Sequence, residues 1–148
     1  PDKKLYVAGN GPMMEEMQRY VREHHMENVK FLGYLQKDEM SEKFYQAKAV
    51  IMTSQCYEAF AMTIAEAYSY GVPVIAGRVG NMDGMVQDGI TGVKFTYNSA
   101  EDLADKISAF DAMDLSVLKK NARAFYAERL RPEDNYQTLI RIYEDISK

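Results

Sequence analysis

Short apolar runs alternate with helix-length segments of mixed polarity along the first hundred residues. The apolar runs predict strands at 3–8, 29–32, 49–53, 72–76 and 93–96. Helical spacing and turn residues predict helices at about 12–24, 37–47, 60–70 and 82–87. Strands that alternate with helices are joined by right-handed crossovers into a parallel sheet with helices on both faces. The pattern therefore predicts an α/β fold of the doubly wound class.

The last fifty residues are predicted to be helical. Three apolar stripes recur there at helical spacing: Leu103, Ile107 and Phe110; Leu115, Leu118, Ala122 and Phe125; and Tyr136, Leu139, Ile140, Tyr143 and Ile146. No repeat, low-complexity tract or linker divides the chain. A content of 47% hydrophobic and 27% charged residues is typical of one globular domain.

Charge and cysteine content exclude several classes of function. The 18 basic and 22 acidic side chains are mixed along the chain, so no basic stripe suits a nucleic-acid backbone. Cys56 is the single cysteine, which excludes an internal disulfide and favours a reducing, cytoplasmic setting. No apolar run reaches the roughly 18 residues that cross a bilayer. Because the first residue is Pro rather than Met, we expect the chain to belong to a longer translated protein.

The loops that follow the strands are the expected ligand sites of an open parallel sheet. After the first strand, Gly9 and Gly11 allow the backbone to approach a ligand, and the next helix offers a positive N-terminus to a phosphate. A plain turn explains the same residues. A dinucleotide-binding fingerprint would place a third glycine where Met14 stands, so binding of NAD is disfavoured.

Two carboxylates, Glu58 and Glu66, bracket the start of the helix that follows the third strand. In a helix their spacing spans roughly 12 Å, which suits an elongated polyol held at both ends, because carboxylates accept hydrogen bonds from hydroxyls. Backbone N–H groups near 59–62 would face a diphosphate or a sugar oxygen. The alternative is structural, with Glu58 as a capping acid and Glu66 as a solvated surface residue.

The segment 58–76 closely resembles the donor-site signature of retaining glycosyltransferases of group 1. Three more segments resemble parts of that family in the right order: the strand and glycine turn at 5–12, the next strand at 29–34, and a late glycine segment at 86–92. The resemblance covers about residues 3–97. It identifies the chain as the C-terminal donor-binding domain of a group 1 (GT4-like) enzyme with the GT-B fold.

The resemblance implies a role for particular residues. The GT-B fold has two facing Rossmann-like domains, and residues 1–148 would be the donor-binding one, without the acceptor domain and the first strand–helix unit. Glu58 would be catalytic beside the donor sugar, and Glu66 would bind the ribose hydroxyls. The remaining donor-binding residues would be Gly9, Gly11, Tyr34, Leu35, Ala59, Phe60, Ala61 and Met62, with Tyr34 and Leu35 touching the base through main-chain groups.

The resemblance also implies the reaction: retaining transfer of a hexosyl group from a UDP- or GDP-sugar to a glycan or lipid-linked acceptor, which the absent N-terminal domain would bind. No cofactor is expected, and no metal, since the chain has no Asp-x-Asp. We expect polysaccharide or glycolipid assembly, in the cytoplasm and peripheral at the inner membrane face, with the isolated fragment inactive. The alternatives are a non-catalytic nucleotide-sugar binding module and a nucleotide-sugar epimerase of the same fold.

The chain departs from the family pattern at three places. Ala61 replaces a usual glycine, and Gly80-Asn81-Met82-Asp83-Gly84 replaces a loop that ends in Glu. The usual Arg and Lys pair is missing, which leaves Arg78 as a candidate near phosphate. The missing upstream unit would also supply the strand between 3–8 and 49–53, so we expect rearrangement, strand-mediated self-association or marginal stability.

Overall fold

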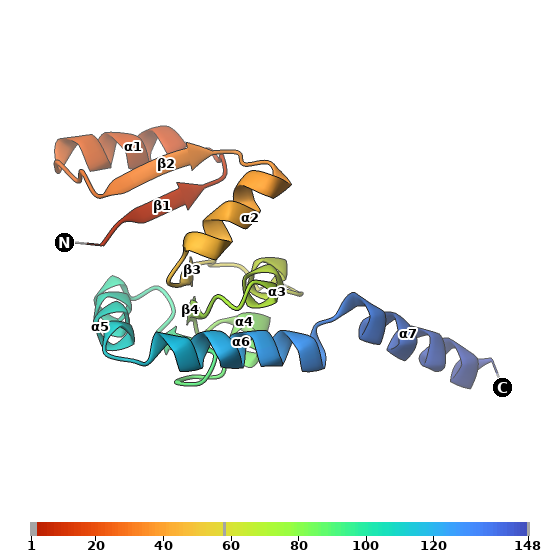
Figure 1. The fold of residues 1–148 in the computed structure, drawn as a ribbon. Coiled ribbons are helices and arrows are strands. Elements are labelled where there is room, and N and C mark those ends of the chain that lie inside the picture. Colours follow the sequence, from red (N-terminus) through yellow and green to blue (C-terminus); the bar gives the residue numbers. More distant parts are fainter. Residues whose placement is uncertain (1–2, 58, 148) are drawn as a thin grey trace. The chain divides into compact units, whose positions relative to one another are not determined.

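The computed structural model describes residues 3–57 and 59–147, so Glu58 lies outside the described residues. The chain divides into two compact units, Pro1–Lys43 and Phe44–Lys148. Each contains parallel strands connected through helices (Figure 1). The predicted α/β class is confirmed.

The first unit contains β1 (Leu5–Ala8), α1 (Met14–Glu23), β2 (Val29–Gly33) and most of α2 (Lys37–Gln46). The two strands are parallel, with Leu5 opposite Val29. The helix predicted from residue 12 begins two residues later, because residues 11–14 form a turn in which the Met14 N–H donates to the Gly11 carbonyl at 3.0 Å. None of the described residues of this unit is buried.

The second unit is built on a parallel sheet in the order β3 (Val50–Met52), β4 (Val74–Gly77), β5 (Gly92–Phe95). Two helices connect its strands, α3 (Met62–Ser69) and α4 (Gly80–Met85). The central strand β4 is buried along its whole length. Gly92 packs so closely against it that a Cβ at this position would lie 1.8 Å from the Val74 carbonyl oxygen.

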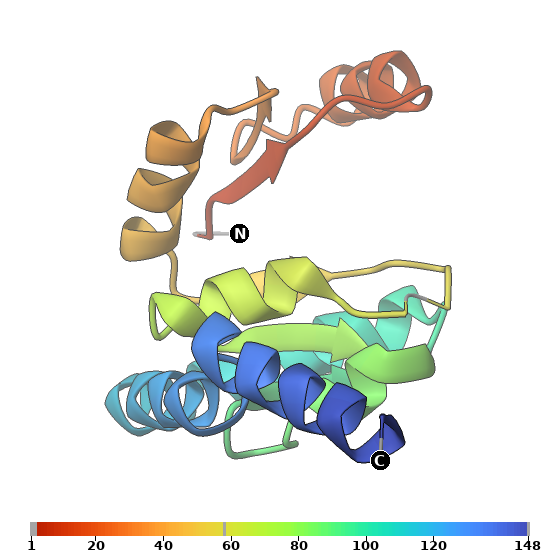
Figure 2. The ribbon, with the colours of Figure 1, turned by 90° about the vertical axis from the view of Figure 1, so that its right-hand side faces the viewer.

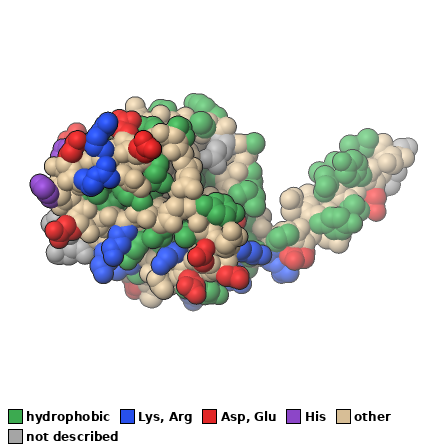
Figure 3. Space-filling model, turned by 90° about the horizontal axis from the view of Figure 1, so that it is seen from above, with side chains coloured by type: hydrophobic (Ala, Val, Ile, Leu, Met, Phe, Trp, Pro, Cys, Tyr) green, Lys and Arg blue, Asp and Glu red, His purple; other side chains and the backbone are tan. Residues whose placement is uncertain are grey.

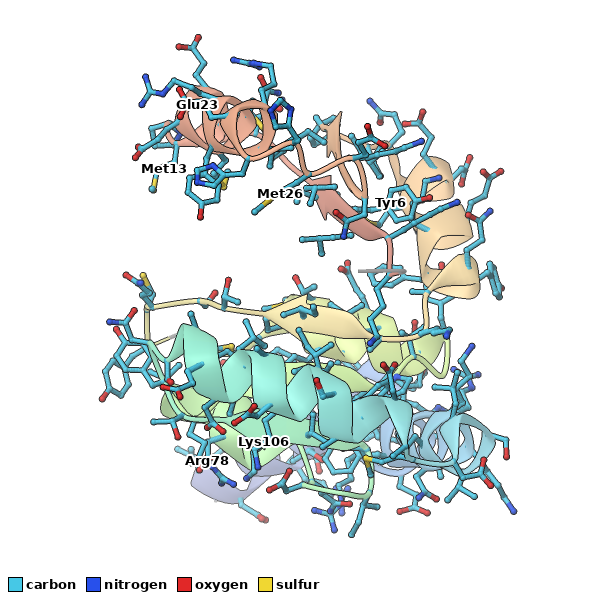
Figure 4. All side chains as sticks on the ribbon, turned by 90° about the vertical axis from the view of Figure 1, so that its left-hand side faces the viewer. Tyr6, Met13, Glu23, Met26, Arg78 and Lys106 are labelled. Carbon is cyan, nitrogen blue, oxygen red and sulfur yellow. The ribbon has the colours of Figure 1, made fainter. Side chains whose placement is uncertain are left out.

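Helices cover both faces of this second sheet. Helix α3 lies beside β4 on one face (Figure 2), and α5 (Ala100–Asp111) lies across the other (Figure 4). Helix α6 (Leu115–Arg129) packs against α3. A buried cluster joins the sheet to α5 and α6; its members are Ile75, Val93, Phe95, Phe110 and Leu118. The core therefore holds the carboxyl ends of β3 and β4 in fixed positions.

Helix α7 (Pro132–Ile146) forms as predicted but buries none of its residues. Its large apolar side chains are exposed, and hydrophobic atoms cover much of the helix that projects at the right of Figure 3; the residues are Tyr136, Leu139, Ile142, Tyr143 and Ile146. The apolar stripe thus predicted the helix and not its burial. No helix in the described part of the chain is long and apolar enough to cross a membrane.

The described strands form two parallel sheets, β1-β2 and β3-β4-β5, instead of one. Self-association through these strands stays a prediction.

Candidate functional site

The loop from residue 53 to residue 61 leaves the carboxyl end of β3 and leads into α3. Ala61 is the N-cap of α3, and its own side chain makes no capping hydrogen bond. The Met62 N–H donates to the Phe60 carbonyl at 3.0 Å. One of the N–H groups that we expect to face a donor, that of Met62, is therefore already paired within the chain, because the chain turns tightly at Phe60 before the helix begins.

Ala61 stands where the family usually has glycine. It is fully buried. Its carbonyl accepts from the Ile64 N–H at 2.9 Å, which closes the first turn of α3. The methyl group therefore packs inside the domain, and the exposed residues before the helix are Ala59 and Phe60.

Helix α3 has one buried face and one exposed face. Its buried residues are Ile64, Ala65, Ala67 and Tyr68. Met62, Thr63 and Glu66 are exposed, and Met62 and Glu66 lie one helical turn apart on the same face. The Glu66 main-chain carbonyl accepts from Ser69 Oγ at 2.7 Å. The Glu66 carboxylate thus faces solvent on a rigid helix.

Tyr68 anchors the buried face of α3. Its hydroxyl lies 2.7 Å from Thr91 Oγ1, and its ring meets Phe125 of α6 edge-on with centroids 5.6 Å apart. Burial raises the pKa of Tyr68 to about 12, while the Thr91 hydrogen bond acts in the opposite direction. The neutral hydroxyl is therefore the stable form in the folded protein, and it fixes the helix that carries Glu66.

Side chains from elsewhere in the second unit form hydrogen bonds with the backbone or side chains near both ends of the loop. Asn81 Nδ2 donates to the Ala59 carbonyl. At the other end, Gln55 Nε2 donates to Asn98 Oδ1 at 3.2 Å, and the Tyr97 hydroxyl lies 3.4 Å from the Gln55 carbonyl. Asn81 was not among the predicted site residues; its one signal in the sequence is its place in the segment 80–84, which departs from the family pattern.

Arg78 lies in a network of ion pairs. Its guanidinium lies 2.9 Å from Asp88 Oδ2 and 3.6 Å from Asp83 Oδ1. Figure 4 shows Arg78 and Lys106 at the same edge of the second unit. Because two carboxylates already balance the charge of Arg78, the geometry does not support the expectation that it neutralises a phosphate.

The predicted residues of the first unit follow its two parallel strands. Gly9 adopts a φ of 114°, which favours glycine, and its N–H donates to the Gly33 carbonyl at 2.7 Å. Gly11 has open space around it, Tyr34 is exposed and Leu35 is half-buried. The carboxyl ends of parallel strands meet at one edge of a sheet, so the structure gathers these four residues at one edge of β1-β2.

The sequence profile of the family described as "Glycosyl transferases group 1" matches residues 1–123. The chain belongs to this family. The identification made from the donor-site signature and the three further segments is confirmed. Among the described residues, no group of three or more His, Cys, Asp or Glu side chains is arranged to hold a metal ion.

Several known proteins are similar to this chain in sequence or in structure. The sulfoquinovosyl transferase of Arabidopsis thaliana is 30% identical over 128 residues, which are 83% of this chain and 24% of the relative. The sucrose-phosphate synthase of Thermosynechococcus elongatus superposes with a TM-score of 0.84 at 24% identity, over 97% of this chain and 38% of that one. HepE of Anabaena, solved with UDP-glucose, has a TM-score of 0.79 at 25% identity, over 98% and 42%. The chain thus spans less than half the length of each of these proteins.

Proposed function

We propose that residues 1–148 are the donor-binding domain of a glycosyltransferase that moves a hexosyl group, with retention and without a metal, from a nucleotide sugar to a glycan or lipid-linked acceptor. The observation that carries the proposal is the exposed Glu66 carboxylate on α3, a helix whose N-cap residue, Ala61, makes no side-chain capping hydrogen bond. Family membership supports it, as does the similarity to HepE, which was solved with UDP-glucose. We place the whole protein in the cytoplasm, peripheral at the inner membrane face.

In this proposal, Glu66 accepts hydrogen bonds from the ribose hydroxyls of the donor. A carboxylate acceptor makes hydrogen bonds about twice as strong as neutral ones. The loop residues Ala59 and Phe60 present backbone groups to the sugar and the diphosphate, and the positive end of α3 favours that negative charge. Our assignment of Gly9, Gly11, Tyr34 and Leu35 to nucleotide contacts stays a prediction for the first unit.

The chemistry requires a negative leaving group and a sugar that becomes positively charged. The bond from the anomeric carbon to the diphosphate oxygen breaks, and its electron pair leaves with the diphosphate. The acceptor hydroxyl oxygen then bonds the same carbon on the same face, and its proton passes to the departing diphosphate oxygen. Glu58, which lies outside the described residues, would stabilise the positive sugar, and the N-terminus of α3 the departing diphosphate.

A second candidate is a binding module that catalyses nothing by itself. The observation that favours it is length, since the chain spans 24% to 42% of the relatives named above. Under this view, residues 1–148 bind the nucleotide sugar as part of a non-catalytic relative of the family. The two candidates share one donor site and differ in whether the full-length protein turns over the donor.

The test uses the full-length protein that contains this chain, with isothermal titration of UDP, GDP and their glucose conjugates. Glu66→Ala should weaken binding of the preferred nucleotide roughly tenfold, the cost of losing charged hydrogen bonds. Glu128→Ala, a change at an exposed glutamate on α6, is the matched control and should stay within about twofold of wild type.

Release of nucleoside diphosphate from the glucose conjugate, with water as acceptor, measures turnover alongside binding. Glu66→Ala should raise the donor KM and leave kcat within about twofold, because a ribose contact contributes equally before and during the reaction. EDTA should leave the rate unchanged. An unchanged donor affinity in Glu66→Ala would contradict the assignment, and loss of turnover in EDTA would contradict metal independence.

A further inference from the structure

The loop that precedes α3 has to be ordered before it can hold a donor. Residues 53–61 contain no helix or strand in the described part, and Tyr57 and Phe60 expose 85% and 49% of their surface. A loop with so little burial gains little order from packing. Fixing the backbone of one residue costs about 1–2 kcal/mol in conformational entropy. Side-chain hydrogen bonds that already hold the loop reduce the part of this cost that remains when a ligand binds.

Asn81 supplies the tether next to the helix. Its amide nitrogen donates to the carbonyl of Ala59, 22 residues earlier in the chain. Ala59 precedes the tight turn at Phe60 and the buried N-cap Ala61. A bond at Ala59 therefore fixes the last free stretch of backbone before α3. The bonds of Gln55 to Asn98 and Tyr97 hold the opposite end of the same loop.

Asn81 can act as a tether because α4 is itself held firmly. Met82 and Met85 bury their side chains in the domain. Asp83 Oδ1 lies 2.9 Å from Lys94 Nζ, and the same ammonium group donates to the Asp83 carbonyl at 2.9 Å. The Lys94 side chain is only 14% exposed, so this ion pair is more strongly shielded than those of Arg78. Asn81 thus projects from a fixed helix toward the loop.

We propose that Asn81 is a positioning residue for donor binding: its amide holds the Ala59 carbonyl, so the loop is preorganised before the nucleotide sugar arrives. This inference rests on the proposed function. Ordering the loop in advance removes part of the entropy cost of binding. Asn81 touches neither the donor nor the reacting atoms in this proposal, and it acts through the backbone of Ala59.

Two variants in the full-length protein separate the hydrogen bond from the shape of the side chain. Asn81→Ala removes the donor group, and Asn81→Asp keeps the shape but turns an oxygen toward the Ala59 carbonyl. We expect the preferred nucleotide among UDP and GDP to bind roughly fivefold more weakly to Asn81→Ala, and more weakly still to Asn81→Asp. The donor KM should rise by the same factors while kcat stays within about twofold.

Asn121→Ala is the matched control. Asn121 lies on α6, and its Nδ2 donates to the Ile90 carbonyl at 3.2 Å, an exposed bond of the same chemical type. This variant should lower the melting temperature about as much as Asn81→Ala and leave nucleotide affinity within about twofold. Hydrogen exchange gives a readout that needs no ligand: backbone amides in the segment 54–61 should exchange faster in Asn81→Ala and at the wild-type rate in Asn121→Ala.

Unchanged nucleotide affinity in both Asn81 variants, with a wild-type protein that binds, would overturn this inference and leave the proposed function standing. Equal losses of affinity in Asn81→Ala and Asn121→Ala would also overturn it, because a general loss of stability would then explain both. If the wild-type protein binds none of UDP, GDP and their glucose conjugates, the proposed function fails, and the role of Asn81 in donor binding fails with it.

Discussion

The two units have similar apolar patterns in sequence and different burial in the structure. In the first unit, none of the described residues is buried, and Met13, Met17 and Tyr20 of α1 and the turn before it stay exposed. In the second unit, β4 is buried completely and a continuous cluster joins the sheet to α5 and α6. A two-stranded sheet is too small to enclose a core. An apolar stripe thus indicates which face of an element will pack, and the number of neighbouring strands decides how well that face is covered.

The largest loss of stability is expected for a substitution at Gly92, in the tightly packed second unit. A Cβ there would lie 1.8 Å from the Val74 carbonyl oxygen and 2.9 Å from the Val74 nitrogen, and neither backbone atom can move without breaking the sheet. Gly92→Ala should cost at least about 4 kcal/mol of unfolding free energy. Gly84→Ala, with open space around the residue in α4, should stay within about 1 kcal/mol. Equal denaturation midpoints for the two variants would contradict the tight packing of the second unit.

Next in size is the buried hydroxyl of Tyr68. Tyr68→Phe removes its hydrogen bond to Thr91 and should cost about 1–2 kcal/mol near neutral pH. Burial raises the pKa of Tyr68 from 10.0 to about 12 in the folded protein. The unfolded chain therefore ionises first, so the tyrosine's contribution is present below pH 10 and is lost as the pH rises toward 12.

Over that pH range, wild type should lose about 2–3 kcal/mol more stability than Tyr68→Phe, since each unit of pKa difference is worth 1.36 kcal/mol. Urea denaturation at a series of pH values measures the difference. Parallel pH profiles for the two proteins would show that Tyr68 is not shielded from water in the folded state.

A smaller and local effect is expected in the first unit at Gly9. Its φ of 114° is unfavourable for a residue with a side chain, although a Cβ would meet no atom within 4 Å. Gly9→Ala should therefore cost about 1–3 kcal/mol through backbone strain alone. Gly11→Ala, which has open space and no positive φ, is the control. Hydrogen exchange at 5–8 and 29–33 should accelerate in the first variant and not in the second.

The smallest effect concerns Lys43, whose ammonium lies 5.5 Å from the centroid of the Tyr6 ring. Because Tyr6 is exposed, Lys43→Ala should cost at most about 1 kcal/mol, the usual value of an exposed cation–π contact. Exchange at the amides of β1 measures it. A loss as large as that of Tyr68→Phe would show that the first unit depends on a shielded contact and would weaken the contrast between the units.

Much of the fold was predictable because glycine and proline residues mark the ends of the short strands. The predicted helix at 60–70 begins at Met62 instead, since the turn at Phe60 uses the first amide. The helix predicted at 82–87 forms at Gly80–Met85, because Gly80, with a φ of 51°, lets the chain turn into the helix there and the chain becomes extended at Val86. These errors concern local hydrogen bonds at element ends, which hydrophobic spacing does not encode.

The candidate site was less predictable. The exposed position of Glu66 follows from helical spacing, since its neighbours at 64, 65, 67 and 68 form the apolar face. The bond from Asn81 to Ala59 joins residues 22 positions apart, and no spacing rule predicts it. Arg78 seemed available from its place after the fourth strand, but it pairs with Asp83 of α4 and with Asp88 of the following loop. These ion pairs form only in the folded chain.

The most direct test of the donor site combines a change in the protein with a change in the ligand. In the full-length protein, the preferred nucleoside diphosphate and its 2′,3′-dideoxy analogue are titrated into wild type and Glu66→Ala. If Glu66 binds the ribose hydroxyls, the analogue should bind wild type roughly tenfold more weakly and should bind Glu66→Ala as well as the natural nucleotide does. An equal loss of affinity for the analogue in both proteins would contradict the assignment of Glu66 and, with it, the donor site proposed at the start of α3.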